Sequence, residues 1–254
     1  MKNYFITFCF DGTNYYGTQK QSKFPSVTQT FEDVLKTIYL EDIKFLCCSR
    51  LDRGVHGLFL GGNFLTDSEK IDVGNMVYTF NRLLPSDIRV LSASIVAEDF
   101  SSRYDAVRKT YLYRINTSEV CSPFLIKYCY HSFLKIDFNK LENVKKLFIG
   151  EHDFYSFSTE DEDKNTVNTI ESIDIIKEDD NISIRISGRK FLRYQIRYIV
   201  GAMLEFAYNK ISMEDIIYRL NNRDRKSKRF KVEAKGLFLE NVEFDFKRSL
   251  NAEI

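Results

Sequence analysis

The stretch IKFLCCSRLDRGVHGLFLGGNF, residues 43–64, places a polar loop between two apolar runs. The runs 43–48 and 58–64 have the length and composition of β-strands. Between them, Asp52 has an arginine on either side, Arg50 and Arg53, and Gly54 permits a sharp turn. Nearby positive charge favours an ionised carboxylate, which can act as a nucleophile. Taken alone, such a loop more often holds a solvated or salt-bridged aspartate.

The elements around this loop predict a split βαβ unit in the first half of the chain. Residues 4–10 are typical of a short strand, and Ser26 opens a helix with Val27, Phe31, Val34, Leu35 and Ile38 on one face. A helix over 71–84, stopped by Pro85, and a strand over 88–96 follow.

The second half repeats this pattern less cleanly. It predicts strands over 107–115 and 182–186, a helix over 138–148, a long helix over 190–208 and a terminal strand over 236–244. On the long helix, Arg189, Arg193 and Arg197 would form a basic stripe opposite the apolar face. Such a stripe is either a solvated face or a surface for an anionic ligand.

We therefore expect an α+β protein of two tandem units, ferredoxin-like or RRM-like. The first unit, residues 1–103, carries the Asp52 loop, and the second, residues 104–254, carries the basic helix. The units are expected to pack into one continuous antiparallel sheet with a central cleft. A cleft between two units is a natural place for an elongated ligand.

The composition excludes several classes of protein. The five cysteines are odd in number and have no CxxC spacing, which indicates reduced thiols and a cytoplasmic location. None of the three histidines is spaced from a cysteine or histidine as metal ligands are, so no metal site is expected. The apolar run 198–208 is interrupted by Glu205 and is far shorter than the about 20 residues of a membrane span.

Charge is segregated along the chain although the net charge is only +1. Residues 219–231 carry seven basic side chains against one acid, and residues 160–163 are all acidic. Segregation of this kind makes a local positive field possible. A solvated surface loop is an equally good explanation of the basic segment, and the better one for the acidic run.

Several segments, in order, resemble one known family. The loop at 50–57 is similar to the R-T-D-x-G-V-H-A motif of the tRNA pseudouridine synthase A family. Further matches to its motifs lie at 10–19 (FDGTNYYGTQ), 81–88 (NRLLPSDI), 103–113 (ending in KTYLY), 150–157 (GEHDFYSF), 191–201 (FLRYQIRYIVG) and 235–239 (KGLFL). Any one segment is weak evidence, whereas an ordered series across residues 4–244 is strong.

The resemblance implies an isomerase that converts uridine to pseudouridine in the anticodon stem-loop of tRNA, at tRNA positions 38–40. It further implies a homodimer without cofactor or metal, in which the motif aspartate, here Asp52, is the catalytic group. Tyr111 matches the family's base-stacking tyrosine, and Arg197 matches the arginine that pairs with the aspartate. For RNA contacts we expect Arg50, Arg53, Arg189 and Arg193, with help from residues 219–231.

This chain departs from the family pattern at Leu51, Arg53, Gly57 and Thr18. Leu51 and Arg53 flank the aspartate, so they could change which uridine or which RNA the protein accepts as substrate. Two other hypotheses therefore stand beside the leading one: a paralogue that modifies another RNA, and a non-catalytic RNA-binding protein on the same scaffold. Whether Asp52 attacks the ribose or removes a ribose proton to give a glycal is also open.

Overall fold

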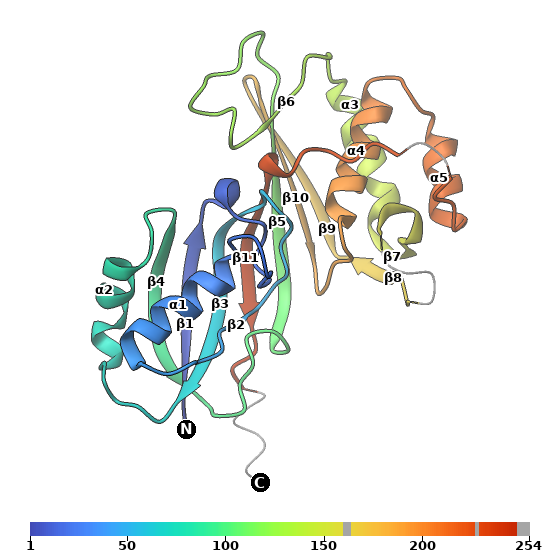
Figure 1. Cartoon of the computed structure of the whole chain (residues 1–254). Coiled ribbons are helices and arrows are strands. Elements are labelled where there is room, and N and C mark those ends of the chain that lie inside the picture. The colour runs from blue at the N-terminus through green and yellow to red at the C-terminus, as the bar shows by residue number, and fades with distance from the viewer. Residues whose placement is uncertain (160–163, 227–228, 248–254) are drawn as a thin grey trace. The chain divides into compact units, whose positions relative to one another are not determined.

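The computed structural model describes residues 1–159, 164–226 and 229–247, which form two compact units (Figure 1). The first unit combines Met1–Arg108 with the segment that begins at Phe238, and the second is Lys109–Leu237. These units differ from the expected domains 1–103 and 104–254. The terminal strand was expected to close the second unit, but its residues Phe238 and Leu239 pair with His56 and Gly57 of the first.

The first unit is a sheet in the order β4-β1-β3-β11 with two helices. Its antiparallel strands are β1 (Lys2–Phe10), β3 (His56–Thr66) and β4 (Ile88–Val96), while β11 (Leu237–Phe244) runs parallel to β3. The helices are α1 (Val27–Tyr39) and α2 (Val73–Leu83), and β2 (Leu46–Cys47) is a short strand on β3. The predicted order of strands and helices is confirmed.

Both helices cover one face of this sheet, where aromatic side chains form the core (Figure 1). Phe31 of α1 packs against Phe8 of β1 and Phe80 of α2, with ring centroids 4.8 and 6.3 Å apart. The helix begins where the sequence predicts, because the Ser26 hydroxyl accepts the Gln29 amide at 3.3 Å and caps the first turn.

The second unit has strands in the order β5-β10-β9 and a helical layer. The strands are β5 (Ala106–Asn116), β9 (Ser172–Glu178), β10 (Asn181–Gly188) and the short β6 (Tyr130–His131), beside a small sheet of β7 (Gly150–Asp153) and β8 (Val167–Ile170). The helices are α3 (Phe138–Val144), α4 (Gln195–Ala207) and α5 (Met213–Asn221), of which α3 packs against α4 (Figure 1). The α+β class with mostly antiparallel strands is confirmed.

The long helix α4 begins at Gln195, not at residue 190, so the predicted basic stripe is wrong. Tyr194 has a left-handed backbone with φ of 63°, which interrupts a right-handed helix at this point. The Gln195 side chain holds this bend, since its Oε1 accepts the Leu192 amide at 2.8 Å. Arg189 and Arg193 therefore lie outside the helix and share no helical face with Arg197.

No helix in the described ranges is long and apolar enough to cross a membrane. The described side chains also contain no group of three or more His, Cys, Asp or Glu residues placed to hold a metal ion.

The loop after β1 packs directly on the loop that carries Asp52. A Cβ added to Gly17, whose φ is 92°, would lie 2.2 Å from the carbonyl oxygen of Leu51. A Cβ added to Gly12 would lie 2.0 Å from the carbonyl oxygen of Val55. Side chains do not fit at such distances, so the two glycines allow the loops to lie backbone to backbone.

We predict that Gly17→Ala lowers the free energy of unfolding by about 2–4 kcal/mol, since it adds backbone strain to a steric clash. Urea unfolding followed by circular dichroism measures the change. Gly74→Ala is the matched control, because a Cβ there meets only the flexible end of Asp72, at 3.1 Å. Equal stability losses in the two variants would contradict the close loop packing.

Candidate functional site

Asp52 lies in a tight turn between β2 and β3. The Val55 amide donates to the Asp52 carbonyl oxygen at 3.2 Å, and Gly54 closes the turn with φ of 76°. Asp52 is half-buried, whereas Arg50 and Arg53 are exposed. The loop thus holds one carboxylate at the protein surface between two solvent-facing cations.

Thr18 fastens this turn to the loop after β1. Its hydroxyl donates to the Ser49 carbonyl oxygen at 2.8 Å and accepts the Leu51 amide at 2.9 Å. The Thr18 amide also donates to the Leu51 carbonyl oxygen at 3.3 Å, and Thr18 itself is 1% exposed. The sequence showed Thr18 only as a departure from the family pattern. In the structure it satisfies three backbone groups of the segment that leads into Asp52.

The two departures that flank Asp52 have different environments. Leu51 is 7% exposed and belongs to the core, whereas Arg53 is exposed. Of the two, only Arg53 presents its side chain to solvent. The departure at Leu51 therefore affects packing, whereas the departure at Arg53 is accessible to a ligand.

Other residues of the matched motifs support the loops. The buried His56 accepts the Gly12 amide at Nδ1, 3.0 Å away, and its ring stacks on Phe238. The Tyr15 hydroxyl donates to Asp87 at 2.7 Å, and burial, followed by this bond, raises the pKa of Tyr15. These contacts make His56 a residue that packs the two loops together. Tyr15 and Asp87, which the sequence did not mark as site residues, also help to hold the loop after β1 in place.

Tyr111 and Arg197 lie in the second unit. Tyr111 is on β5 opposite Ile186, is 6% exposed and meets Phe191 edge-on, with ring centroids 5.1 Å apart. Arg197, in the first turn of α4, donates from Nε to the carbonyl oxygen of Val232 at 2.8 Å. The predicted pairing of Arg197 with Asp52 stays a prediction, because these residues belong to different units.

A cluster of cations surrounds Tyr194, at the bend before α4. The guanidinium carbons of Arg193 and Arg197 lie 4.9 and 5.3 Å from the ring centroid, and Lys231 Nζ lies 4.0 Å away. Arg193 is exposed and Arg197 half-buried. Arg189, which follows β10, is exposed and precedes the bend. The structure therefore gathers Arg193 and Arg197 at one aromatic side chain, without the helical spacing expected for them.

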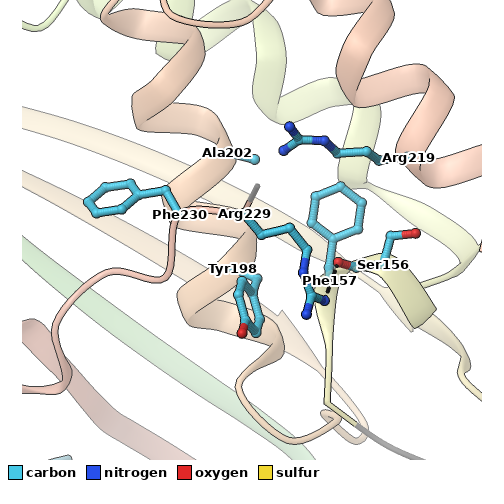
Figure 2. Close-up of a pocket in the computed structure, with 7 residues that line it drawn as sticks. All are labelled: Ser156, Phe157, Tyr198, Ala202, Arg219, Arg229 and Phe230. Atoms are coloured by element: carbon cyan, nitrogen blue, oxygen red, sulfur yellow. Dashed lines mark hydrogen bonds between the residues drawn. The ribbon is translucent and has the colours of Figure 1, made fainter. Parts of the chain in front are cut away.

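Three arginines of the basic segment 219–231, Arg219, Arg225 and Arg229, pack into the second unit, whereas Arg223, Lys226 and Lys231 are exposed. Residues 227–228 lie outside the described residues. Arg229 donates to the carbonyl oxygens of Ser156 and Ser158 at 3.0 and 3.1 Å, and burial lowers the pKa of its guanidinium. Arg219 is 8% exposed and lies 3.8 Å from Glu205. Figure 2 shows these two arginines in a pocket that they line with Ser156, Phe157, Tyr198, Ala202 and Phe230.

This packing corrects the expectation that the whole basic segment is available to RNA. Arg225 also donates to the carbonyl oxygen of Tyr155 at 2.9 Å, and its guanidinium carbon lies 3.6 Å from that ring's centroid. A guanidinium that satisfies backbone carbonyls stabilises the loop it crosses. The acidic run at 160–163 lies outside the described residues.

Comparison with known proteins gives consistent matches. A family model described as tRNA pseudouridine synthase matches residues 144–245. A tRNA pseudouridine synthase A 2 of Bacillus cereus is 34% identical over 246 residues, which are 96% of this chain and 100% of that protein. The tRNA pseudouridine synthase A of Acetivibrio thermocellus is 35% identical over 95% of this chain and 99% of its own length.

The same family name recurs in a third bacterium. The tRNA pseudouridine synthase A of Aquifex aeolicus is 34% identical over 242 residues, which are 95% of this chain and 99% of that protein. Identity above 30% over nearly the full length of both proteins shows that they belong to one family. This chain belongs to the tRNA pseudouridine synthase A family and is an isomerase of the class that converts uridine to pseudouridine.

Proposed function

We propose that this protein isomerises uridine in the anticodon stem-loop of tRNA, at tRNA positions 38–40, with Asp52 as the catalytic nucleophile. The observation that carries the proposal is the placement of Asp52, half-buried in a braced turn between two exposed arginines. The names of the relatives, which are tRNA pseudouridine synthases, support the substrate class.

The chemistry requires a carboxylate at the ribose. The bond between uracil N1 and ribose C1′ breaks, the base turns over, and a new bond joins C5 to C1′. The C5 proton leaves, and N1 takes up a proton. Asp52 attacks C1′ in the nucleophilic route, whereas in the glycal route it removes a ribose proton. Both routes use Asp52 as its carboxylate ion.

A uridine inside a stem must leave its stack before this reaction, at a cost of a few kcal/mol. We assign the receiving surface to Tyr111 and the orientation of the Asp52 carboxylate to Arg197. Because Tyr111 is only 6% exposed, it would act as part of the floor of the site and not as a free-standing ring. Arg197 is suited to a fork with a carboxylate, since its Nε already donates to Val232 and holds the guanidinium in place.

Phosphate contacts are assigned to exposed cations. Arg50, Arg189 and Arg193 are all exposed, and phosphate contacts dominate RNA affinity. Arg53 is also exposed and is assigned to an RNA contact beside the extruded uridine. Arg219, Arg225 and Arg229 are left out of this set because they bind groups of their own unit. A local set of this kind is compatible with a net charge of +1.

The central test is incubation with unmodified tRNA transcripts followed by chemical mapping of pseudouridine. We predict site-specific product with the unaltered protein and a loss of at least about 1000-fold in rate with Asp52→Ala, as expected for a removed nucleophile. Asp67→Ala is the matched control, because Asp67 is an exposed carboxylate of the same unit with 81% side-chain exposure.

The same experiment separates the other hypotheses. Product found only in other RNAs would favour a paralogue with a different substrate. Arg53, a departure from the family pattern beside Asp52, is the reason to test this alternative. Binding of RNA without product from any RNA would favour a non-catalytic RNA-binding protein. Equal activity of Asp52→Ala and the unaltered protein would remove Asp52 from the mechanism.

We further predict that Arg193→Glu weakens tRNA binding and reduces its salt dependence, because binding releases fewer counterions once a phosphate contact is lost. Filter binding across a salt series measures both quantities. Arg82→Glu is the control, since Arg82 is an exposed residue of α2 and the charge change is the same. An unchanged salt slope for Arg193→Glu would refute the assignment.

The protein is also proposed to act as a cytoplasmic homodimer. The segment between β5 and α3 exposes large apolar side chains, with Val120, Phe124 and Phe133 82%, 85% and 86% exposed. Contiguous apolar surface marks interaction sites, and we assign the dimer contact to this segment. Cys121 Sγ and Cys129 Sγ lie 3.7 Å apart as free thiols, which suits a reducing compartment.

Sedimentation equilibrium tests the homodimer. We expect the unaltered protein to sediment as a dimer and the variant Phe124→Ser/Phe133→Ser to shift toward the monomer, because it removes apolar area from the interface. Tyr78→Ser is the control, as Tyr78 on α2 is 68% exposed and outside this segment. A monomeric unaltered protein at micromolar concentration would overturn the proposal.

A further inference from the structure

Next to Asp52, Arg53 is the outer layer of a three-layer stack. Its guanidinium carbon lies 4.1 Å from the centroid of the Tyr16 ring. The Tyr16 ring is itself stacked on Phe24, with centroids 4.1 Å apart and planes inclined by 9°. Two groups at this distance cannot share one face of a ring without overlapping, so Arg53 and Phe24 cover opposite faces of Tyr16.

The backbone beneath the stack is fixed by hydrogen bonds that do not involve the stacked groups. The Tyr16 amide donates to the Pro25 carbonyl oxygen at 2.9 Å, and the Gln21 side chain donates to the Tyr16 carbonyl oxygen at 2.8 Å. On the other side, the Gly54 amide donates to the carbonyl oxygen of Tyr15 at 3.3 Å. The stack is therefore preorganised on two braced loops.

The three side chains of the stack are accessible to solvent, so the stack is not part of the buried core. Arg53 is exposed, Phe24 is 46% exposed, and Tyr16 is half-buried. Within residues 1–159, 164–226 and 229–247, Arg53 has no carboxylate partner at ion-pair distance. A cation over an exposed ring contributes about 0.5–1 kcal/mol, a modest gain for holding the loop that Thr18 already secures.

The chemistry of the stack matches an unpaired nucleobase. RNA-binding proteins recognise bases that have left a helix by stacking them on aromatic rings or on the plane of an arginine. The Arg53 guanidinium lies over the Tyr16 ring and Arg53 is exposed, so the side of the guanidinium away from the ring is open to a planar ligand. Arg53 directly follows Asp52, so this surface would lie beside the uridine that Asp52 is proposed to modify.

We propose that the stack of Arg53, Tyr16 and Phe24 is a platform on which an unpaired base next to the target uridine stacks. The inference rests on the proposed function, because the base belongs to the RNA that Asp52 modifies. Arg53 and the aromatic rings beneath it would then select substrates whose loop can deliver such a base. The platform binds and positions RNA and takes no part in bond making or breaking.

The test compares Arg53→Lys with Arg53→Ala in pseudouridine formation on a tRNA transcript. Lysine keeps the positive charge but loses the flat surface, so both variants should raise KM about tenfold, with a smaller effect on kcat. Arg82→Lys is the matched control, because Arg82 lies over the exposed Tyr78 ring at 5.9 Å, on α2 and away from the Asp52 loop. This control should leave KM unchanged.

A second readout detects stacking without catalysis. In the Asp52→Ala protein, a stem-loop that lacks the base beside the target uridine should bind about tenfold more weakly than the intact stem-loop, and Arg53→Lys should remove most of this difference. Phe24→Leu, which removes the last ring of the stack but keeps an apolar side chain, should give an intermediate result in both assays.

The outcomes are distinguishable. If Arg53→Lys keeps the KM of the unaltered protein while Arg53→Ala does not, Arg53 contacts a phosphate and the platform is overturned. If both variants keep that KM, Arg53 has no part in binding and the platform is likewise overturned. An unaltered protein that forms no pseudouridine in any RNA overturns the proposed function, and the platform with it.

Discussion

The hydroxyl of Thr18 holds the Asp52 loop through two hydrogen bonds, one to the Ser49 carbonyl oxygen and one from the Leu51 amide. A buried backbone group without a hydrogen-bond partner costs about 1–3 kcal/mol. The buried Thr18 hydroxyl avoids this cost by bonding to the Ser49 carbonyl and the Leu51 amide. Gly17 makes this possible, because any side chain there would displace the Leu51 carbonyl. The Asp52 carboxylate, proposed as the nucleophile, and the proposed Arg53 platform both depend on this junction of two loops.

On the first unit, the candidate site residues Asp52 and Arg53 lie on loops held together by hydrogen bonds. On the second unit, the candidate cations gather at the bend before α4. The left-handed Tyr194 ends the strand-to-helix connection, and its ring becomes the centre around which Arg193, Arg197 and Lys231 gather. Cations held near an aromatic ring keep their charge but lose freedom, which lowers the entropy cost of binding a polyanion. A nearly neutral protein can bind RNA with few cations if those cations are ordered in advance.

The sequence predicted elements whose signals are local. The helix after Ser26 follows from its cap and its apolar period, and the strands around Asp52 follow from composition, although β2 is reduced to Leu46–Cys47. The start of α4 was not predictable, since the bend depends on the Gln195 side chain and on a left-handed tyrosine that no pattern marks. Arg229 was misassigned to the surface for a similar reason: its carbonyl partners lie about 70 residues away, at Ser156 and Ser158. Asp52 was predicted from its motif and stays a prediction, whereas the stack of Arg53, Tyr16 and Phe24 beside it joins residues of two loops and appears only in three dimensions.

The Asp52 carboxylate is proposed to drive the exchange of a C1′–N1 bond for a C1′–C5 bond. This exchange expels the hydrogen of uracil C5, so tRNA transcribed with uridine tritiated at C5 gives a direct measurement. We predict that the protein releases tritium into water in a one-to-one ratio to the pseudouridine formed, and that the Asp52→Ala variant releases none. Tritium retained in RNA that the protein binds, or release that persists without the Asp52 carboxylate, would contradict it.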